Sequence, residues 1–407
     1  MNLRKISLIF FINLILSIYI IESFLTIFEL QNTRKIKNYI SSIVENHNNS
    51  NQTKFDLTGE IDFIKNLNKN KIKIWPRISP YSYVWERKED RLEAKIKKDD
   101  NKKIVDSIFL SGRSNVLTAG CNENSYYSTF ISDRYGFSNN DKIWDNKIIE
   151  YLIIGDSFAM GDCVNSHNTI AHNLNNLGLS SISLGYPGNG PLLELASMIE
   201  YITGTTKKIV WLFYEGNDFE DFEIELEDPL LLNYLNNNSF NQNLIHRQHE
   251  IDFILDKKLE KVLATEEKGG NFISINTPKF YFTSKSFLKF YKTRMFIKKI
   301  IKKNNNKKII VEFEKVIKTA KSIAEKNNSQ FCFVYLPEIN RYNQDYFYKF
   351  ISKKDKVLNI LKKNNINTID ASLVFNSKMH KFFFSYSGAH YNEKGYLKIS
   401  NLIYENC

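Results

Sequence analysis

Hydrophobic residues between positions 150 and 405 alternate between short apolar runs and longer amphipathic stretches. Short apolar runs that end at glycine, proline or polar residues are typical of buried strands, whereas apolar positions three and four residues apart are typical of helices. The pattern predicts strands at Tyr151–Ile154, Ser181–Leu184, Ile209–Tyr214, Phe331–Leu336 and Asn367–Ile369. It predicts helices at Thr169–Leu177, Pro191–Ile202, Phe313–Lys326, Lys353–Lys363 and Glu393–Tyr404.

Strands that alternate with helices in this way form a parallel sheet, because each crossover helix returns the chain to the same end of the sheet. The strand runs are apolar at successive positions, which indicates burial on both faces. The sequence therefore predicts an α/β fold, a three-layer αβα sandwich with a central parallel sheet. In such sheets a functional site lies at the carboxyl ends of the strands.

The N-terminal region carries the most continuous apolar pattern of the chain. Ile6–Ile21 is almost entirely apolar, Glu22 interrupts the pattern, and Ser23–Phe28 extends it. A bilayer is crossed by roughly 20 predominantly apolar residues. No small-residue cleavage motif follows, so the sequence predicts an uncleaved transmembrane helix in preference to a secretion signal, with a buried soluble helix as the plain alternative.

Changes of composition divide the chain into further regions. Residues 1–29 are the predicted anchor, and residues 30–75, which are polar and rich in Asn and Lys, are a predicted stalk. Residues 76–146 are a predicted N-terminal lobe, and residues 147–407 hold the α/β pattern. Residues from about 220 to 308 interrupt that pattern and are predicted to form an inserted helical span that caps or lines the site.

Basic residues are in excess, and the formal net charge is +11. Arg4 and Lys5 precede the predicted anchor, but Arg34, Lys35 and Lys37 follow it, so the positive-inside rule gives nearly balanced evidence on orientation. Elsewhere the lysines are scattered and accompany no nucleic-acid-binding motif, so nucleic acid is not a predicted partner. A solvated surface is the plain interpretation, and attraction to an anionic glycan or to lipid headgroups is the alternative.

The first motif with chemical potential is Gly155-Asp156-Ser157, which directly follows the first predicted strand. A serine at such a turn presents its hydroxyl at the carboxyl edge of the sheet, and its N–H lies at a helix start, where the dipole favours an anion. Acyl transfer requires a reachable nucleophile and a donor to the oxyanion. An ordinary Gly-Asp-Ser turn is the alternative.

Two further motifs follow the next two predicted strands. Gly185–Gly190 contains three glycines, which allow a tight turn and a close approach of backbone to ligand. Gly188 is a candidate N–H donor to an oxyanion, and Asn217, in Gly216-Asn217-Asp218, is a candidate side-chain donor. Plain strand-to-helix turns are the alternative for both segments.

The fourth candidate is His390, in a loop directly before the last predicted helix. A histidine at this edge of the sheet is well placed to act as a general base. His246 and His249 could share a helix face, but no carboxylate or cysteine pattern completes a metal site around them. We therefore predict a site without a metal.

The four motifs follow one another along the chain as Gly-Asp-Ser, Gly, Gly-Asn-Asp and His. In this order the sequence resembles the SGNH or GDSL hydrolases, whose name lists the Ser, Gly, Asn and His of their four conserved blocks. The resemblance covers roughly residues 147–407 apart from the insertion, and implies a flavodoxin-like SGNH fold that needs no cofactor. It implies that Ser157 is the nucleophile and His390 its base. It also implies an oxyanion hole formed by the N–H groups of Ser157 and Gly188 and the side chain of Asn217.

Within that superfamily the chain looks most like membrane-anchored proteins linked to bacterial cell-surface polysaccharides, which remove ester groups from glycans or transfer acetyl groups onto them. Cys121-Asn122-Glu123 and Asp133–Phe137 resemble the segment that precedes the nucleophile in that group. The resemblance implies an acylated glycan as substrate and, for a transferase, a membrane protein as acyl donor. It also implies a single-pass protein whose catalytic domain is periplasmic or otherwise extracytoplasmic.

The sequence departs from this family at the acid that orients the histidine. An Asp is usual two or three residues before the catalytic His, but Gly388 and Ser387 occupy those positions. Loss of the orienting Asp lowers kcat by about 10⁴ in a serine protease. Three alternatives are open: a backbone carbonyl orients His390 in a Ser–His dyad, Asp370 after the fifth strand supplies the acid, or the protein is weakly active or inactive.

Four cysteines are present, at positions 121, 163, 332 and 407. Cys332 lies inside a predicted strand and is predicted to be a buried free thiol. Cys121 and Cys163 lie in polar, turn-like segments near the predicted site, where a disulfide would suit an exported domain. Two unrelated reduced thiols are the alternative.

The sequence thus predicts a serine esterase acting on ester bonds, with the O-acetyl groups of a cell-surface glycan as the substrate that the resemblance implies. A glycan O-acetyltransferase that uses the same site is the first alternative. A catalytically degraded protein that binds glycan and serves in assembly is the second; the missing Asp favours it, and the intact Ser, Gly, Asn and His disfavour it. A lipid esterase or thioesterase is a further alternative, favoured by proximity to the membrane.

Overall fold

The computed structural model describes residues 3–50, 54–56, 58–97, 107–267, 287, 290–294, 297, 306–342, 354–375, 380–386 and 390–407. Part of the predicted insertion lies outside these residues, and so do Ser387 and Gly388, the two positions before His390 where an Asp is usual. The chain forms two compact units, which are treated separately below. One unit comprises residues 1–55 and 273–308, and the other comprises residues 56–272 and 309–407.

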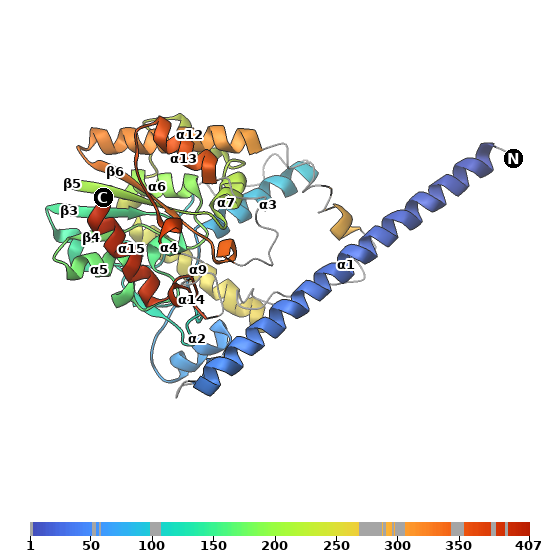
Figure 1. Ribbon diagram of the computed structural model, residues 1–407, viewed down its shortest axis with the longest axis horizontal. Coiled ribbons are helices and arrows are strands. Elements are labelled where there is room, and N and C mark those ends of the chain that lie inside the picture. Colours follow the sequence, from blue (N-terminus) through green and yellow to red (C-terminus); the bar gives the residue numbers. More distant parts are fainter. Residues whose placement is uncertain are drawn as a thin grey trace. The chain divides into compact units, whose positions relative to one another are not determined.

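The first unit is built on one long helix, α1 (Leu3–Ser50; Figure 1). Its segment Ile9–Phe28 is long and apolar enough to cross a membrane, so the prediction of an N-terminal apolar helix is confirmed. Glu22, which interrupts the apolar pattern, is buried against residues of the insertion, and its two carboxylate oxygens accept the backbone N–H groups of Lys292 and Thr293 at 2.8 and 2.7 Å. A carboxylate in an apolar segment is thereby provided with hydrogen-bond donors.

The second unit contains a five-stranded parallel sheet with the strand order β4-β3-β5-β6-β7 (Figure 1). Its strands are β3 (Ile148–Ile154), β4 (Ser181–Ser183), β5 (Thr205–Tyr214), β6 (Gln330–Leu336) and β7 (Asn367–Asp370). Renumbered along the chain, this order is 2-1-3-4-5, the flavodoxin-like arrangement. The predicted fold class is confirmed.

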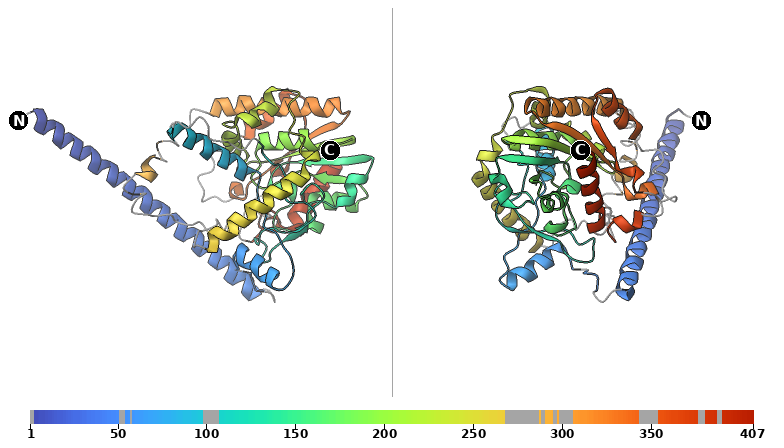
Figure 2. Two further views of the ribbon diagram at one scale, coloured as in Figure 1. Left: turned by 180° about the vertical axis from the view of Figure 1, so that it is seen from behind. Right: turned by 60° about the vertical axis from the view of Figure 1, so that its left-hand side comes forward.

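Alternate strand residues point to opposite sides of the sheet, and both sets are apolar here. Helices therefore cover both faces and bury them. Trp211 belongs to the larger core cluster and its neighbour Leu212 to the smaller one. Figure 2 shows the sheet from two further directions with its helices on either side. The larger cluster is covered by α6 (Pro191–Tyr201), α8 (Pro229–Asn236), α9 (Gln248–Glu267), α12 (Asn306–Lys326) and α13 (Lys354–Lys363). The smaller one is covered by α4 (Ser157–Met160), α5 (Ile170–Asn176), α14 (His380–Phe383) and α15 (Glu393–Asn406).

The residues before the sheet add helices and a second, smaller sheet to the same unit, and Tyr83 and Val84 pack into its larger core cluster. Helices α2 (Glu60–Lys69) and α3 (Tyr81–Lys97) are followed by a two-stranded antiparallel sheet of β1 (Leu117–Ala119) and β2 (Thr129–Ile131). Residues 120–128 connect these two strands and are called the β1–β2 loop below. The predicted boundaries of stalk, lobe and insertion stay predictions, since the compact units divide the chain at other positions.

One cysteine prediction is wrong. Cys332 on β6 is buried, as expected, but it is not a free thiol: it forms a disulfide with Cys407 at the end of α15, with 5.9 Å between the two Cα atoms. The apolar context of Cys332 predicted burial correctly but carried no information on a partner 75 residues away. The bond fixes the end of the last helix to β6, the strand next to the edge strand β7.

Candidate active site

Ser157 lies at the carboxyl end of β3, in the turn to the single-turn helix α4. The turn is tight at Gly155, where φ is +154° and a Cβ atom would come within 2.9 Å of Ala159 and of the Leu212 carbonyl oxygen. The Asp156 carboxylate caps α4 by accepting the N–H of Phe158 at 2.9 Å. Because α4 has only four residues, the local N–H groups, and not a long helix dipole, are what this turn offers to an anion.

His390 lies in the segment that leads into α15, and it meets Ser157 directly. Its Nε2 atom is 2.8 Å from the Ser157 hydroxyl oxygen. The ring lies beside that of Phe158, with 5.1 Å between the ring centroids, and Asn392 caps the helix that follows by accepting the N–H of Gly395. The structure thus brings together the two residues predicted as nucleophile and base.

The acid that faces His390 is Glu123, on the β1–β2 loop. One carboxylate oxygen is 3.1 Å from His390 Nδ1, and the other accepts the Ser385 hydroxyl at 2.7 Å and the backbone N–H of His390 at 3.2 Å. The Glu123 side chain is only 9% exposed, so the contact is shielded from water. Glu123, His390 and Ser157 therefore form a continuous carboxylate–imidazole–hydroxyl chain.

Asp370, the sequence-based candidate for this acid, lies elsewhere. Its carboxylate pairs with Lys354 Nζ at 2.6 Å and accepts the Ser372 hydroxyl at 2.7 Å. Asp370 caps the turn that follows β7, which explains why it occurs at that strand end. The sequence left open whether Asp370 or a backbone carbonyl orients His390. In the structure Glu123, and not Asp370, lies at hydrogen-bond distance from His390 Nδ1.

The charges of Glu123 and His390 support each other. Burial acts to raise the pKa of Glu123, but the charge of His390 and three hydrogen bonds outweigh it, and the pKa falls below its ordinary value. Burial acts to lower the pKa of His390, but the charge and hydrogen bond of Glu123, with smaller contributions from Asp162 and Asp156, raise the pKa to about 9. The resting site is therefore a Glu⁻–His⁺ ion pair at neutral pH, and Ser157 is activated as His390 loses its proton.

Two further carboxylates lie near the hydroxyl. Asp162 Oδ2 is 4.0 Å from His390 Nε2, and Asp162 itself forms a buried ion pair with Arg77. Asp156 Oδ2 is 3.4 Å from the Ser157 hydroxyl, and burial raises the pKa of Asp156 to about 6. Arg77 balances the charge of Asp162, so Glu123 is the carboxylate that binds the imidazole at hydrogen-bond distance.

Gly188 and Asn217 follow β4 and β5, the two strands on either side of β3. Ser157 is thus at the middle one of three neighbouring strand ends, at the point where the strand order reverses. Gly188 has φ +77°, and a Cβ atom there would meet Tyr81 and Ser79 at 3.3 and 3.4 Å. This backbone conformation and the close neighbours explain the glycine.

Carboxylates of Glu225 and Asp221 hold the two segments that carry the candidate oxyanion donors. Glu225 accepts the N–H groups of Gly190 and Leu192 at 2.6 and 2.8 Å, which fixes the loop that carries Gly188. Asn217 Nδ2 donates to Asp221 at 2.6 Å, an interaction that orients the amide and leaves its second N–H for a ligand. Burial raises the pKa of Asp221 to about 7 and that of Glu225 to about 8.

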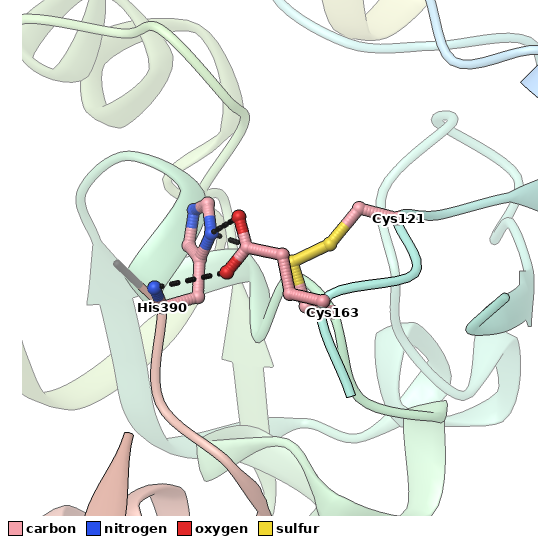
Figure 3. Close-up of side chains that lie close together, drawn as sticks. Cys121, Cys163 and His390 are labelled. Carbon is pink, nitrogen blue, oxygen red and sulfur yellow. Dashed lines mark hydrogen bonds and ion pairs between the residues drawn. A yellow bond between two sulfur atoms is a disulfide. The ribbon is translucent and has the colours of Figure 1, made fainter. Parts of the chain in front are cut away.

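The predicted pairing of Cys121 with Cys163 is present as a disulfide, with 4.7 Å between the Cα atoms. Figure 3 shows this bond directly beside the His390 imidazole, and Cys163 Sγ is 3.3 Å from His390 Nδ1. Among the described residues, these two cysteines cluster with Glu123 and His390 as side chains of metal-ligand type. Thiolates and not disulfides bind metals, and here the two sulfur atoms are bonded to each other.

No family model and no curated protein matches the chain. Among solved structures, the chain is similar to a protein from Desulfitobacterium hafniense assigned to the G-D-S-L lipolytic family, at 12% identity and a TM-score of 0.33, covering 64% of this chain and 99% of that one. It is also similar to a protein from Bacteroides fragilis described as an acylhydrolase, at 11% identity and a TM-score of 0.31. This likeness covers 63% of this chain and 85% of that one. At these scores neither likeness identifies an activity, which has to be argued from the site.

Proposed function

We propose that the protein is a serine esterase of the SGNH type. The observation that carries this proposal is the hydrogen-bonded chain from Glu123 through His390 to the Ser157 hydroxyl, with distances of 3.1 and 2.8 Å. A serine hydroxyl is a weak nucleophile by itself and becomes effective when an oriented base accepts its proton. A buried acid on Nδ1 holds the imidazole in the tautomer that does this.

The proposed reaction is acyl transfer in two steps. His390 accepts the proton of Ser157 as its oxygen attacks an ester carbonyl, and the resulting oxyanion is bound by the N–H groups of Ser157 and Gly188 and the free amide N–H of Asn217. His390 then protonates the alcohol that leaves. Water resolves the acyl-enzyme in the esterase reaction, and a sugar hydroxyl would resolve it in the transferase reaction.

The proposed substrate is an O-acetylated glycan outside the cytoplasm, and the protein is held at the membrane by α1. Support for this location comes from the two disulfides, which use all four cysteines of the sequence and persist in oxidising compartments. Support for membrane attachment comes from the apolar segment Ile9–Phe28. The excess of basic residues suits an anionic polymer.

The test of the proposed function is hydrolysis of p-nitrophenyl acetate by the full chain in detergent, compared with Ser157→Ala. Removal of the nucleophile is expected to lower kcat by about 10⁶. Ser372→Ala serves as the matched control, because that hydroxyl binds Asp370 and not His390. Absence of activity in the unaltered chain, together with absence of Ser157 labelling by a phosphonate, would refute the proposal.

The proposed substrate class needs its own measurement. The released acid is measured in each case: acetate from an O-acetylated polysaccharide, and the corresponding fatty acid from short-chain and long-chain lipid esters. Release from the polysaccharide that depends on Ser157 supports the glycan esterase. Preference for a long-chain ester would instead favour a lipid esterase, and acetyl transfer to a deacetylated polysaccharide would favour the transferase.

A further inference from the structure

The triad acid comes from outside the α/β sheet. Glu123 lies on the β1–β2 loop, and β1 and β2 form a sheet that is separate from the five-stranded one. Within the described part of the chain, the backbone hydrogen bonds of this loop run to its own residues and to Asp56. Side-chain links join this loop to the segments around Ser157 and His390: the Cys121–Cys163 disulfide, Asn124 to the Cys163 carbonyl, and Tyr126 to Glu393.

The covalent link is the Cys121–Cys163 disulfide. Cys121 is two residues before Glu123, and Cys163 is six residues after Ser157, so the bond joins the segment of the acid to the segment of the nucleophile. Asn124 reinforces the junction by donating to the Cys163 carbonyl at 2.9 Å. From this geometry we infer that the disulfide is a positioning element of the triad, which acts on catalysis through Glu123.

The backbone at Cys163 supports this role. Its φ is +68°, in the left-handed region where glycine or asparagine is usual and where most side chains are disfavoured. The residue is fully buried, and its N–H is held by the Asp162 carboxylate at 2.9 Å. A cysteine in such a conformation is accounted for by what its sulfur does, because glycine would fit the backbone with less strain.

The sulfur atoms also shield the acid–base contact. Cys163 Sγ is 3.3 Å from the same imidazole nitrogen that faces Glu123. Exclusion of water strengthens the interaction between the two charges. Loss of the disulfide is expected to leave the carboxylate less fixed. A weaker contact with Glu123, the main group that raises the pKa of His390, lowers that pKa toward its ordinary value.

This inference rests on the proposed function, and it adds a dependence on redox state. A dithiol would cleave the bond by transferring two electrons and two protons to the sulfurs, closing to a cyclic disulfide itself. The two cysteines would then be separate thiols, and the β1–β2 loop would keep only its noncovalent links. A misplacement of about 1 Å at a catalytic group lowers the rate by about 10²-fold, which sets the expected scale.

The test compares the full chain with Cys121→Ala/Cys163→Gly, in which glycine accommodates the left-handed backbone. We expect kcat to fall by about 10- to 10²-fold, with KM unchanged and the midpoint of the pH profile moved to lower pH. Cys332→Ala/Cys407→Ala is the matched control and should leave both unchanged. Treatment of the unaltered chain with dithiothreitol should reproduce the effect without any substitution.

A cycle with Glu123→Gln decides whether the bond acts through the acid. If it does, Cys121→Ala/Cys163→Gly causes no further loss in the Glu123→Gln background. An equal loss in both backgrounds, or no loss in either, would overturn the inference. The titration of His390, followed by NMR of labelled histidine and assigned with His390→Gln, gives a readout that needs no activity. If the esterase proposal fails, a fall in that pKa without the disulfide still supports the inference, and an unchanged pKa refutes it.

Discussion

The two halves of the active site are built in different ways. Ser157, Gly188 and Asn217 follow three neighbouring parallel strands, so the sheet itself places them at one edge. Glu123 comes from a loop of another small sheet and reaches His390 across a junction fixed by a disulfide. The architecture of the fold therefore positions Ser157, Gly188 and Asn217, whereas a few specific side-chain contacts position Glu123.

The largest expected effect concerns the acid half. Glu123→Gln should lower kcat by up to about 10⁴-fold, because the imidazole loses the group that fixes its tautomer and stabilises its charge. Asp370→Asn is the matched control, since Asp370 pairs with Lys354 and should leave kcat unchanged. Steady-state kinetics on p-nitrophenyl acetate measures both. An equal loss in the two variants would mean that Glu123 has no special role.

The next effect concerns the sheet half. Asn217→Ala should lower kcat by about 10²- to 10³-fold, because an oxyanion donor is removed while the triad stays intact. Labelling of Ser157 by a phosphonate should slow in parallel, since that adduct also carries an oxyanion. An unchanged kcat would show that the amide donates only to Asp221 and not to the substrate.

A third prediction uses the charge of His390. The base must be neutral to accept a proton, so kcat/KM should rise about tenfold per pH unit up to a midpoint near pH 9 and level off above it. In Glu123→Gln the midpoint should move to lower pH, because the carboxylate that raises the pKa is gone. The same ion pair stabilises the fold most between the ordinary pKa of Glu123 and that of His390. The contribution of His390 is lost as the pH rises through about 9, and that of Glu123 is lost as the pH falls and its carboxylate is protonated. A midpoint that stays in place in Glu123→Gln would contradict the assignment.

The smallest effect on catalysis is expected at the second disulfide. Cys332→Ala/Cys407→Ala should leave kcat unchanged, because the bond joins β6 to the end of α15, away from the triad. It should lower the free energy of unfolding by about 2–4 kcal/mol through the larger entropy of the unfolded chain. Thermal or denaturant unfolding in detergent measures this. A loss of activity under conditions where the variant is folded would show that the two halves of the site are less independent than the comparison implies.

The same comparison explains what could be predicted from the sequence. The strands at 151–154, 181–184 and 209–214 were recognisable because each is an apolar run followed by a turn. Because parallel strands end at the same edge of a sheet, the placement of Ser157, Gly188 and Asn217 at one edge could be anticipated, although the strand order could not. The structure adds residues to the strands, as in β5, which begins at the polar Thr205.

Glu123 could not be found by local pattern, since no periodicity relates the β1–β2 loop to His390, 267 residues later. A signal was nevertheless present. Glu123 is two residues from Cys121, and the expected partner of Cys121 is Cys163, six residues after Ser157. The expected disulfide therefore places an acid near Ser157. Asp370 was the wrong candidate because a strand-end aspartate also serves as a turn cap. The pairing of Cys332 with Cys407 was missed because the apolar context of Cys332 indicated only burial.

The separation of the triad along the chain has a consequence for biosynthesis. Ser157 and His390 are 233 residues apart, so a ribosome that adds 5–20 residues per second takes roughly 10–50 s between them. During that interval the nascent chain already holds its nucleophile, its acid and both cysteines of the loop junction, but it has no base. In the proposed mechanism the nascent chain is therefore inactive until His390 has been added.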